Sequence, residues 1–220
     1  MNKEIIKELS ARGANIIRFV DISRLPEKQT QGFTKAILLC ISLSQKFVSD
    51  IKEDLPLENN EFSDQEDVVD YLGDWLAEFL RQKGYQAYSQ SDKNNAATGN
   101  FDKATKTANL PHKTIASLSG LGFIGKNSLL VTKDFGSALC MCTVLTDAPI
   151  ETEDAPIISS KCGNCQICKN ICPAKAIHGE EWIPGVEREL LIDVFTCKKC
   201  LKCMANCPWT LKYVRQEVNE

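Results

Sequence analysis

The sequence has no long apolar run, only two histidines and no marked excess of either charge. Its 26 Lys and Arg residues face 29 Asp and Glu residues, so the formal net charge is −3. This balance lacks the basic field that attracts nucleic acids, and we expect no nucleic-acid partner. No run of eighteen apolar residues occurs, and segment 1–10 lacks the basic and then apolar pattern of a secretion signal, so we expect a cytoplasmic location and no membrane contact.

Cysteine, in contrast, is abundant, with eleven in the chain and eight of them between Cys162 and Cys207. Segments 162–173 and 197–208 both follow the pattern C-x-x-C-x-x-C-x-x-x-C-P. Bacterial ferredoxins hold two 4Fe–4S clusters with this spacing, and the fourth cysteine of each run ligates the other cluster. We assign the first cluster to Cys162, Cys165, Cys168 and Cys207. We assign the second cluster to Cys197, Cys200, Cys203 and Cys172.

Disulfides and zinc are the two alternative explanations of these runs. Disulfides fit poorly with a chain that shows no secretion signal, and paired C-x-x-C zinc sites would leave the third cysteine of each run unused. Pro173 and Pro208 are expected to end short helices and turn the fourth thiolate toward the partner cluster. Segment 174–196 would be the linker of the two-cluster module.

The N-terminal part of the chain mixes helical and extended patterns. Apolar residues at helical spacing predict a helix from a capping box at Ser63 to about residue 84, with Trp75 in the core, and Pro111 opens another up to about residue 119. Segment 91–107 is polar and predicts a loop. Strands are expected at 13–22, 35–43, 85–90, 128–132 and 137–146. We therefore predict an α/β or α+β domain over residues 1–155, followed by the two-cluster module over residues 156–220.

The glycine-rich segment Gly120-Leu-Gly-Phe-Ile-Gly-Lys-Asn127 fits G-x-G-x-x-G and nearly fits the phosphate-loop pattern. Its context fits neither motif, because a helical pattern precedes it and a strand pattern follows, and because Asn127 stands where a phosphate loop needs Ser or Thr. The remaining interpretation is a glycine turn where the backbone closely approaches a flat or anionic group, with Lys126 beside it.

With these motifs in place, the chain resembles epoxyqueuosine reductase and its relatives among cobalamin-dependent reductases. The resemblance is carried by the glycine segment, Phe135-Gly-Ser137, Leu145-Thr-Asp147 with Pro149, both cysteine runs and Cys207-Pro-Trp209. It implies a nitroreductase-like domain, a mixed sheet with flanking helices, that seats cobalamin and receives electrons from the ferredoxin module. By position it also implies a cofactor cleft lined by Gly120, Gly122, Gly125, Lys126, Asn127, Phe135, Gly136 and Ser137.

The resemblance has two departures. Lys106 stands where the family has a proton-donating Asp, and we expect a short form without the family's helical-repeat extension. Lys106 and His112 are the candidate catalytic residues, although a single His is commonly a surface or packing residue. The cysteines outside the runs, Cys40, Cys140 and Cys142, are expected to be small buried hydrophobes, with a thiolate at the cofactor as the alternative.

The sequence therefore predicts an iron–sulfur reductase that passes electrons from two 4Fe–4S clusters to cobalamin. FMN is the alternative cofactor, and no second cofactor is a third possibility. The electrons would come from a donor protein or a small-molecule reductant, and the acceptor would be a small molecule or a bound corrinoid. A different class of function is a partner protein that donates electrons or carries a corrinoid without turnover of its own.

Overall fold

The computed structural model describes residues 1–216, which fall into two compact units. The first unit comprises Met1–Ser42, Phe62–Ser119 and Cys140–Pro156. The second comprises Leu43–Glu61, Gly120–Leu139 and Ile157–Glu220, so it joins the cysteine runs to the glycine segment.

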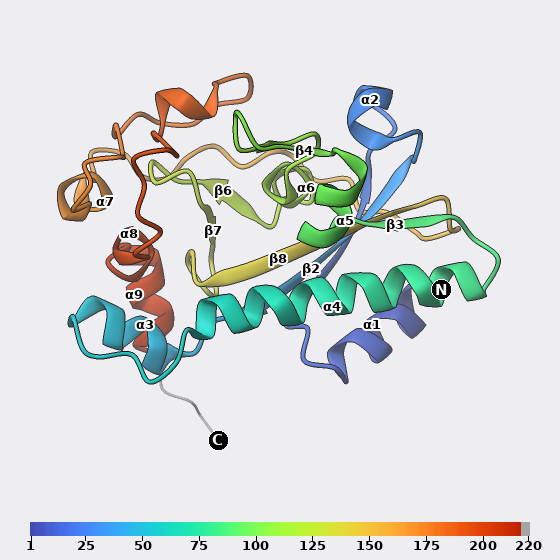
Figure 1. Cartoon of the computed structure of the whole chain (residues 1–220), viewed down its shortest axis with the longest axis horizontal. Coiled ribbons are helices and arrows are strands. Elements are labelled where there is room, and N and C mark those ends of the chain that lie inside the picture. The colour runs from blue at the N-terminus through green and yellow to red at the C-terminus, as the bar shows by residue number, and fades with distance from the viewer. Residues whose placement is uncertain (217–220) are drawn as a thin grey trace. The chain divides into compact units, whose positions relative to one another are not determined.

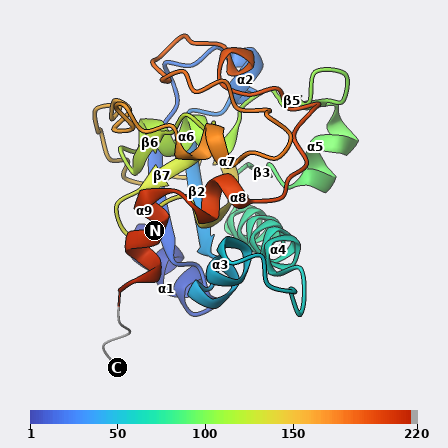
Figure 2. The ribbon, with the colours of Figure 1, turned by 90° about the vertical axis from the view of Figure 1, so that its left-hand side faces the viewer.

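The first unit is built on a four-stranded sheet with the strand order β1-β2-β8-β3. Its strands are β1 (Ile16–Asp21), β2 (Lys35–Ser42), β8 (Leu139–Thr146) and β3 (Ala87–Ser89). The strand β1 pairs antiparallel with β2, with Ile16 opposite Cys40, and β3 pairs antiparallel with β8. Helices α1 (Asn2–Ser10) and α4 (Glu61–Gln82) lie along one face, and α6 (His112–Leu118) lies on the other (Figures 1 and 2). The smaller elements are α2 (Glu27–Thr30), α5 (Asp92–Thr98) and the antiparallel pair β4 (Phe101–Asp102) and β5 (Thr107–Ala108).

A close approach between α4 and the sheet is made possible by Gly73. A Cβ atom added at Gly73 would lie 2.6 Å from the Sγ atom of Cys142 and 2.9 Å from the Oγ atom of Ser89. The apolar side chains of α4 on this face, among them Leu72 and Leu76, are almost fully buried. Each such side chain contributes roughly 1.5 to 3 kcal/mol through its removal from water, so this packing holds the helix in place.

Within residues 1–216, the second unit is made of short elements: an antiparallel hairpin, four helices and one 3₁₀ turn. The hairpin joins β6 (Gly122–Ile124) to β7 (Leu130–Thr132), and the helices are α3 (Gln45–Lys52), α7 (Ile167–Ile171), α8 (Lys202–Ala205) and α9 (Pro208–Val214). The 3₁₀ turn is Arg188–Leu190. Within the linker, Ile177 pairs with Ile192, and Ala176, Ile177 and Leu191 are buried. Helix α3 packs against α8 and α9, and α7 packs against α8 (Figure 2).

The expected mixture of helices and strands is confirmed, and five predicted strands overlap β1, β2, β3, β7 and β8. The long helix begins at Glu61, so Ser63 lies inside its first turn and is not its cap. The Glu61 carboxylate instead accepts hydrogen bonds from the backbone N–H and the hydroxyl of Ser44, at 2.5 and 2.6 Å. Trp75 is only partly buried: its ring stacks on Phe79, and the Arg12 guanidinium lies 4.0 Å from the ring centroid.

Two further expectations were wrong in detail. The predicted loop 91–107 contains helix α5 and strand β4, because Ser91 and Asn94 anchor the segment by hydrogen bonds to Asp74 on α4. Pro173 follows the end of α7 and Pro208 follows the end of α8, as expected, but Pro208 also begins α9, where its missing N–H is tolerated.

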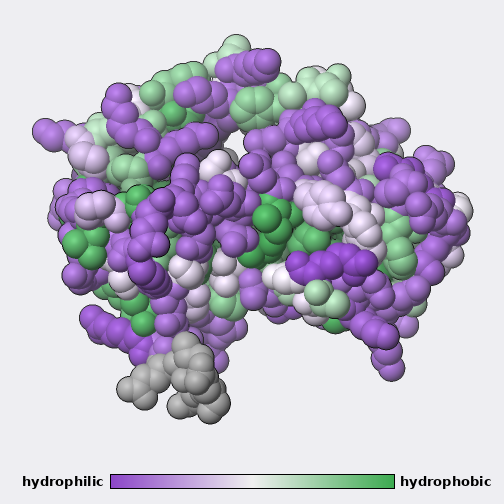
Figure 3. Space-filling view, turned by 60° about the horizontal axis from the view of Figure 1, so that its bottom comes forward, coloured by the Kyte–Doolittle hydropathy of each residue, from purple (hydrophilic) through white to green (hydrophobic). Residues whose placement is uncertain are grey.

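The face shown in Figure 3 is mainly hydrophilic, with small groups of hydrophobic residues between the polar side chains. In the described part of the chain, no helix combines the length and the apolar character needed to cross a bilayer.

Candidate cluster-binding site

Four thiols of the second unit line one cavity of about 150 Å³. They are the first three cysteines of the first run and the last cysteine of the second run: Cys162, Cys165, Cys168 and Cys207. Burial, followed by the neighbouring thiols Cys162, Cys207 and Cys165, raises the pKa of Cys168 to about 11. The structure therefore brings together the set that the ferredoxin spacing predicts for the first cluster, including the member that is distant in sequence.

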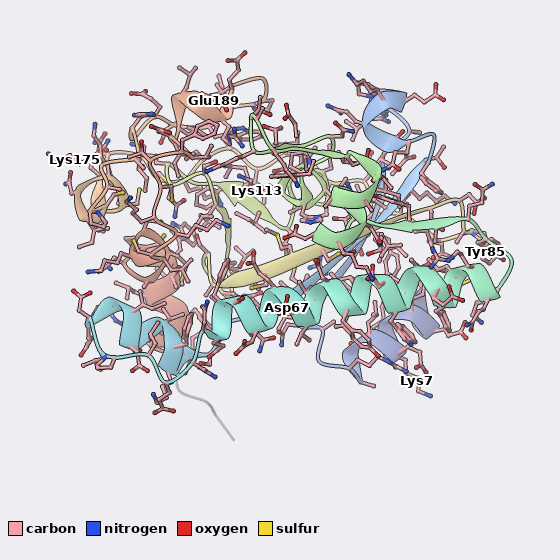
Figure 4. All side chains as sticks on the ribbon, in the orientation of Figure 1. Lys7, Asp67, Tyr85, Lys113, Lys175 and Glu189 are labelled. Atoms are coloured by element: carbon pink, nitrogen blue, oxygen red, sulfur yellow. The ribbon has the colours of Figure 1, made fainter. Side chains whose placement is uncertain are left out.

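The other four cysteines also lie near one another. Burial raises the pKa of Cys203 to about 12, and the thiols that add to the shift are Cys168, Cys200, Cys197 and Cys172. Two thiols of the first run, Cys168 and Cys172, are thus neighbours of Cys203. Sulfur atoms are visible as a group around α7 and α8 in Figure 4.

The local fold explains how the fourth cysteine of each run reaches the other set. Cys172 directly follows α7 in an extended conformation, and Pro173 prevents the helix from continuing. Cys207 is the residue before α9, also extended, between α8 and Pro208. Backbone N–H groups approach two of the sulfurs, from Ala176 to Cys172 at 3.4 Å and from Lys199 to Cys197 at 3.5 Å.

The donor set fits an iron–sulfur cluster better than a single ion. Four thiolates around one zinc ion lie about 4 Å apart, because each Zn–S bond is about 2.3 Å long. Among residues 1–216, no group of three His, Cys, Asp or Glu side chains converges closely enough to hold one metal ion. A cubane spreads its thiolates over four irons, and a cavity of about 150 Å³ leaves room for such a group.

A buried lysine shares the first cavity with its four thiols. Lys126 is 5% exposed, and its Nζ atom donates a hydrogen bond to the backbone carbonyl of Gly163, at 2.6 Å. Gly163 follows the first cysteine of the run, so Lys126 ties the hairpin to the cysteine loop. Asn127 is 3% exposed and also lines the cavity. A cationic group at this position would counter the negative charge of a thiolate-bound cluster.

The glycine segment forms a hairpin, which fits neither nucleotide motif. Gly122 is required by packing inside the hairpin, since an added Cβ would lie 2.3 Å from the carbonyl oxygen of Val131. An added Cβ at Gly125 would lie 2.7 Å from Asn127 Oδ1, and Gly120 has a φ of +63°. These glycines are thus accounted for by close packing or a left-handed backbone.

The second predicted cofactor segment packs on α9. An added Cβ at Gly136 would lie 2.3 Å from the backbone nitrogen of Thr210, and the N–H of Ser137 donates to Thr210 Oγ1 at 3.0 Å. The ring of Phe135 lies 5.3 Å from that of Tyr213. The Ser137 hydroxyl is buried and has no hydrogen-bond partner within residues 1–216. A cofactor contact by these residues stays a prediction.

The two catalytic candidates lie in the first unit, on different elements. Lys106 is exposed in the turn between β4 and β5, with a φ of +52°. His112 is the first residue of α6, next to Lys113, which is labelled in Figure 4. The His112 Nδ1 atom lies 2.9 Å from Thr143 Oγ1, and burial lowers the pKa of the imidazole to about 4. His112 is therefore neutral at pH 7, and its catalytic role stays a prediction.

The three cysteines outside the runs are buried, as expected. Burial raises the pKa of Cys40 to about 12 and raises that of Cys142 well above its usual value. Both thiols therefore stay protonated at neutral pH, which argues against a reactive thiolate at either position.

An acidic group near Cys142 was not found from the sequence. Burial raises the pKa of Asp70 on α4 to about 6, and one of its oxygens accepts a hydrogen bond from the N–H of Asp92, at 2.7 Å. The clue in the sequence was weak, because Asp70 looks like an ordinary acidic residue between the apolar positions of α4. The group can gain or lose a proton near neutral pH.

No protein-family model matches the chain. Segments of the chain are similar to curated proteins named epoxyqueuosine reductase, with 34% identity over 111 residues to that of Lactococcus garvieae and 42% identity over 71 residues to that of Atelocyanobacterium thalassa. The first match covers 49% of this chain and 31% of the relative, and the second covers 32% and 23%. The chain thus spans about a third or less of the curated relatives that it matches.

Solved structures confirm the resemblance at the level of the fold. A selenomethionine-labelled epoxyqueuosine reductase matches with a TM-score of 0.63 and 15% identity, over 96% of this chain and 65% of that one. A catabolic reductive dehalogenase matches with a TM-score of 0.65 and 18% identity, over 92% and 31%. A further dehalogenase structure, described in connection with B12-dependent dehalogenation, has a TM-score of 0.63 and 18% identity, over 90% and 30%.

Another neighbour bears on the expected partners. It is an epoxyqueuosine reductase with a tRNA stem loop, with a TM-score of 0.52 and 19% identity over 80% of this chain and 52% of that one. Its bound RNA weakens the expectation, drawn from net charge, that this chain has no nucleic-acid partner.

Proposed function

We propose that this chain is an iron–sulfur reductase in which two 4Fe–4S clusters pass electrons to a cobalamin-like cofactor in the N-terminal domain. The observation that carries the iron–sulfur part is the single cavity shared by the Cys162, Cys165, Cys168 and Cys207 thiols and the buried Lys126. When bound, each cluster stores one electron and passes it on without proton chemistry. The cysteines of the second run, with Cys172, would hold the other cluster.

The surrounding residues have two roles in this proposal. The Lys126 ammonium holds the Gly163 carbonyl and supplies a fixed positive charge at the first cluster, which favours the reduced state. Trp209 lines the same cavity and lies edge-on to Phe123, with ring centroids 5.4 Å apart, so it covers that side with apolar surface. Limited solvent access and hydrogen bonds to sulfur are the factors that set cluster potentials.

The corrinoid part of the proposal has different support. Pockets for ligands of drug size measure about 300 to 1,000 Å³, whereas the cavity at Cys162 measures about 150 Å³. That cavity suits a cluster and is too small for a macrocycle. The cobalamin assignment draws on the likeness to epoxyqueuosine reductases and to a structure described for B12-dependent dehalogenation. FMN is the alternative cofactor, and an electron-donating or corrinoid-carrying partner protein is the alternative function.

The test is a binding and reduction experiment on anaerobically prepared protein with its clusters in place. Hydroxocobalamin and FMN are titrated separately, and the ultraviolet–visible spectrum is followed before and after addition of reduced methyl viologen. We expect cobalamin to bind at micromolar concentration and to be reduced at least tenfold faster than in Cys168→Ser, which loses one ligand of the first cluster. If neither cofactor binds, the reductase proposal fails and the partner-protein alternative replaces it.

A further inference from the structure

The second unit has a groove of about 400 Å³ beside the cysteine runs. Its lining residues, which we call the basic groove, are Lys169, Asn170, Cys172, Lys175, Ile177 and His178. Lys175 lies next to α7 in Figure 4. The ferredoxin spacing assigns Cys172 to the second cluster, and its thiol is among the neighbours that raise the pKa of Cys203. The groove therefore opens directly on a proposed ligand of the second cluster.

Charge is distributed unevenly along this unit. Segments 161–178 and 194–216 contain eight Lys and Arg residues and no Asp or Glu, whereas the linker 179–193 contains five acidic residues. The cysteine runs are thus basic although the whole chain is slightly acidic. Lys169 and Lys175 are both exposed. Within the described ranges, neither of them forms a salt bridge, so their charges are available to a partner.

The two lysines are held in place by the fold. The aliphatic part of Lys169 lies against Gly179, where an added Cβ would meet its Cδ atom at 2.8 Å. Lys175 has a φ of +52°, and its N–H donates to the carbonyl of Cys172 at 3.0 Å. Its backbone is thereby fixed directly beside the thiol-bearing residue.

Apolar residues are exposed on the same helix. Ile167 and Ile171 of α7, which carries Lys169, are 42% and 39% exposed. Protein interfaces combine apolar contacts with complementary charge, and charge complementarity mainly accelerates association and sets orientation. A basic groove with exposed isoleucines at a cluster ligand is suited to brief, oriented docking of an acidic protein.

We propose that the basic groove docks a small acidic carrier protein that delivers one electron at a time to the second cluster. The reduced carrier loses one electron and the cluster gains it, and no bond or proton is exchanged. Electrons would then leave the module from the first cluster, whose cavity is lined by Gly125, Lys126 and Asn127. This inference rests on the proposed iron–sulfur function and adds the point of electron entry.

The test compares two double charge reversals of equal size. The groove variant, Lys169→Glu with Lys175→Glu, reverses two positive charges of the basic groove. The control variant, Lys3→Glu with Lys28→Glu, reverses the charges of two exposed lysines of the first unit. Cluster reduction is followed by stopped-flow absorbance with a chemically reduced acidic two-iron ferredoxin and, separately, with reduced methyl viologen.

Electrostatic steering changes association rates by about 10-fold to 1,000-fold. We therefore expect the groove variant to react with the ferredoxin at least tenfold more slowly at low salt, and the control to stay within twofold of wild type. Methyl viologen should reduce all three proteins at the same rate. The docking proposal would be overturned if ferredoxin reduced wild type and the groove variant at equal rates, or if the rate fell equally in the control variant. Failure of methyl viologen to reduce the wild type would instead overturn the iron–sulfur function itself.

A labelled tRNA stem loop provides the remaining arm. Suppose that the stem loop binds wild type and the control but not the groove variant, while ferredoxin reduces the clusters of all three at the same rate. The groove is then a nucleic-acid contact and the proposal is wrong. Loss of the ferredoxin rate with unchanged stem-loop binding supports it.

Discussion

Replacing Lys126 by Met should lower the reduction potential of the first cluster. Lys126 is almost fully buried, lines the cavity of Cys162, Cys165, Cys168 and Cys207, and donates to the Gly163 carbonyl. Reduction adds one negative charge to the cluster, and a nearby ammonium stabilises that charge. Removing the ammonium therefore stabilises the oxidised state relative to the reduced state.

The size of this effect follows from Coulomb's law. One unit charge at about 5 to 10 Å, with an effective dielectric constant of about 20, contributes about 1.7 to 3.3 kcal/mol. For one electron this corresponds to about 70 to 140 mV, since about 59 mV is a tenfold change in the equilibrium constant. A fall on the order of 100 mV is therefore expected in Lys126→Met, and a fall of less than half that size in Lys126→Arg, which keeps the charge.

The assay is a redox titration followed by electron paramagnetic resonance on protein with both clusters. Lys161→Met is the matched control, because Lys161 lines the same cavity but is exposed, so solvent screens its charge. The potential of the second cluster should stay nearly constant in all variants. An unchanged potential in Lys126→Met, or an equal fall in Lys161→Met, would refute the assigned role of Lys126.

Three further results are expected. Cys207→Ala should disturb the cluster of the first run and spare that of the second, as followed by paramagnetic resonance; damage confined to the second cluster would contradict the ligand assignment. His112→Gln should change how stability depends on pH. The pKa of His112 is about 4 in the folded state and about 6.5 in the unfolded state. The unfolding free energy of wild type should therefore fall by about 2 kcal/mol relative to the variant between pH 7 and pH 5. Denaturant titrations at both pH values measure this difference. An equal change of unfolding free energy in wild type and variant would show that the imidazole is solvated. Gly136→Ala should lower the melting temperature by several degrees, because its Cβ would lie 2.3 Å from the Thr210 nitrogen; an unchanged melting temperature would mean that α9 shifts without cost.

The cysteine runs could be interpreted from sequence alone because the spacing between neighbouring cysteines indicates which of them bind one cluster. Each run brings three thiols together within seven residues, and the ferredoxin pattern also supplies the distant fourth member. The structure places Cys207 in one cavity with the first three cysteines of the first run, and it places Cys172 near Cys203 of the second run. Strands such as β2 could also be predicted from the sequence, because their β-branched and apolar residues form continuous runs.

Other features depended on contacts that no local pattern reveals. Gly122 and Gly136 resemble ligand-binding glycines in the sequence, yet each faces backbone of a neighbouring segment. The start of α4 was misplaced because the residue that holds the Glu61 side chain, Ser44, is distant from it in sequence. Burial in the folded unit is the main cause of the raised pKa of Asp70, and the neighbouring Asp92 and Asp74 add to it. The neighbour of Gly122 lies in the same hairpin, and the other deciding neighbours are brought near by tertiary packing.

The presence of two 4Fe–4S clusters can be measured by iron and acid-labile sulfide analysis of protein purified and reconstituted without oxygen. Two 4Fe–4S clusters predict about eight irons and eight sulfides per chain, falling to about half in a variant that lacks three cysteines of one run. Stoichiometric zinc with negligible sulfide would contradict the account.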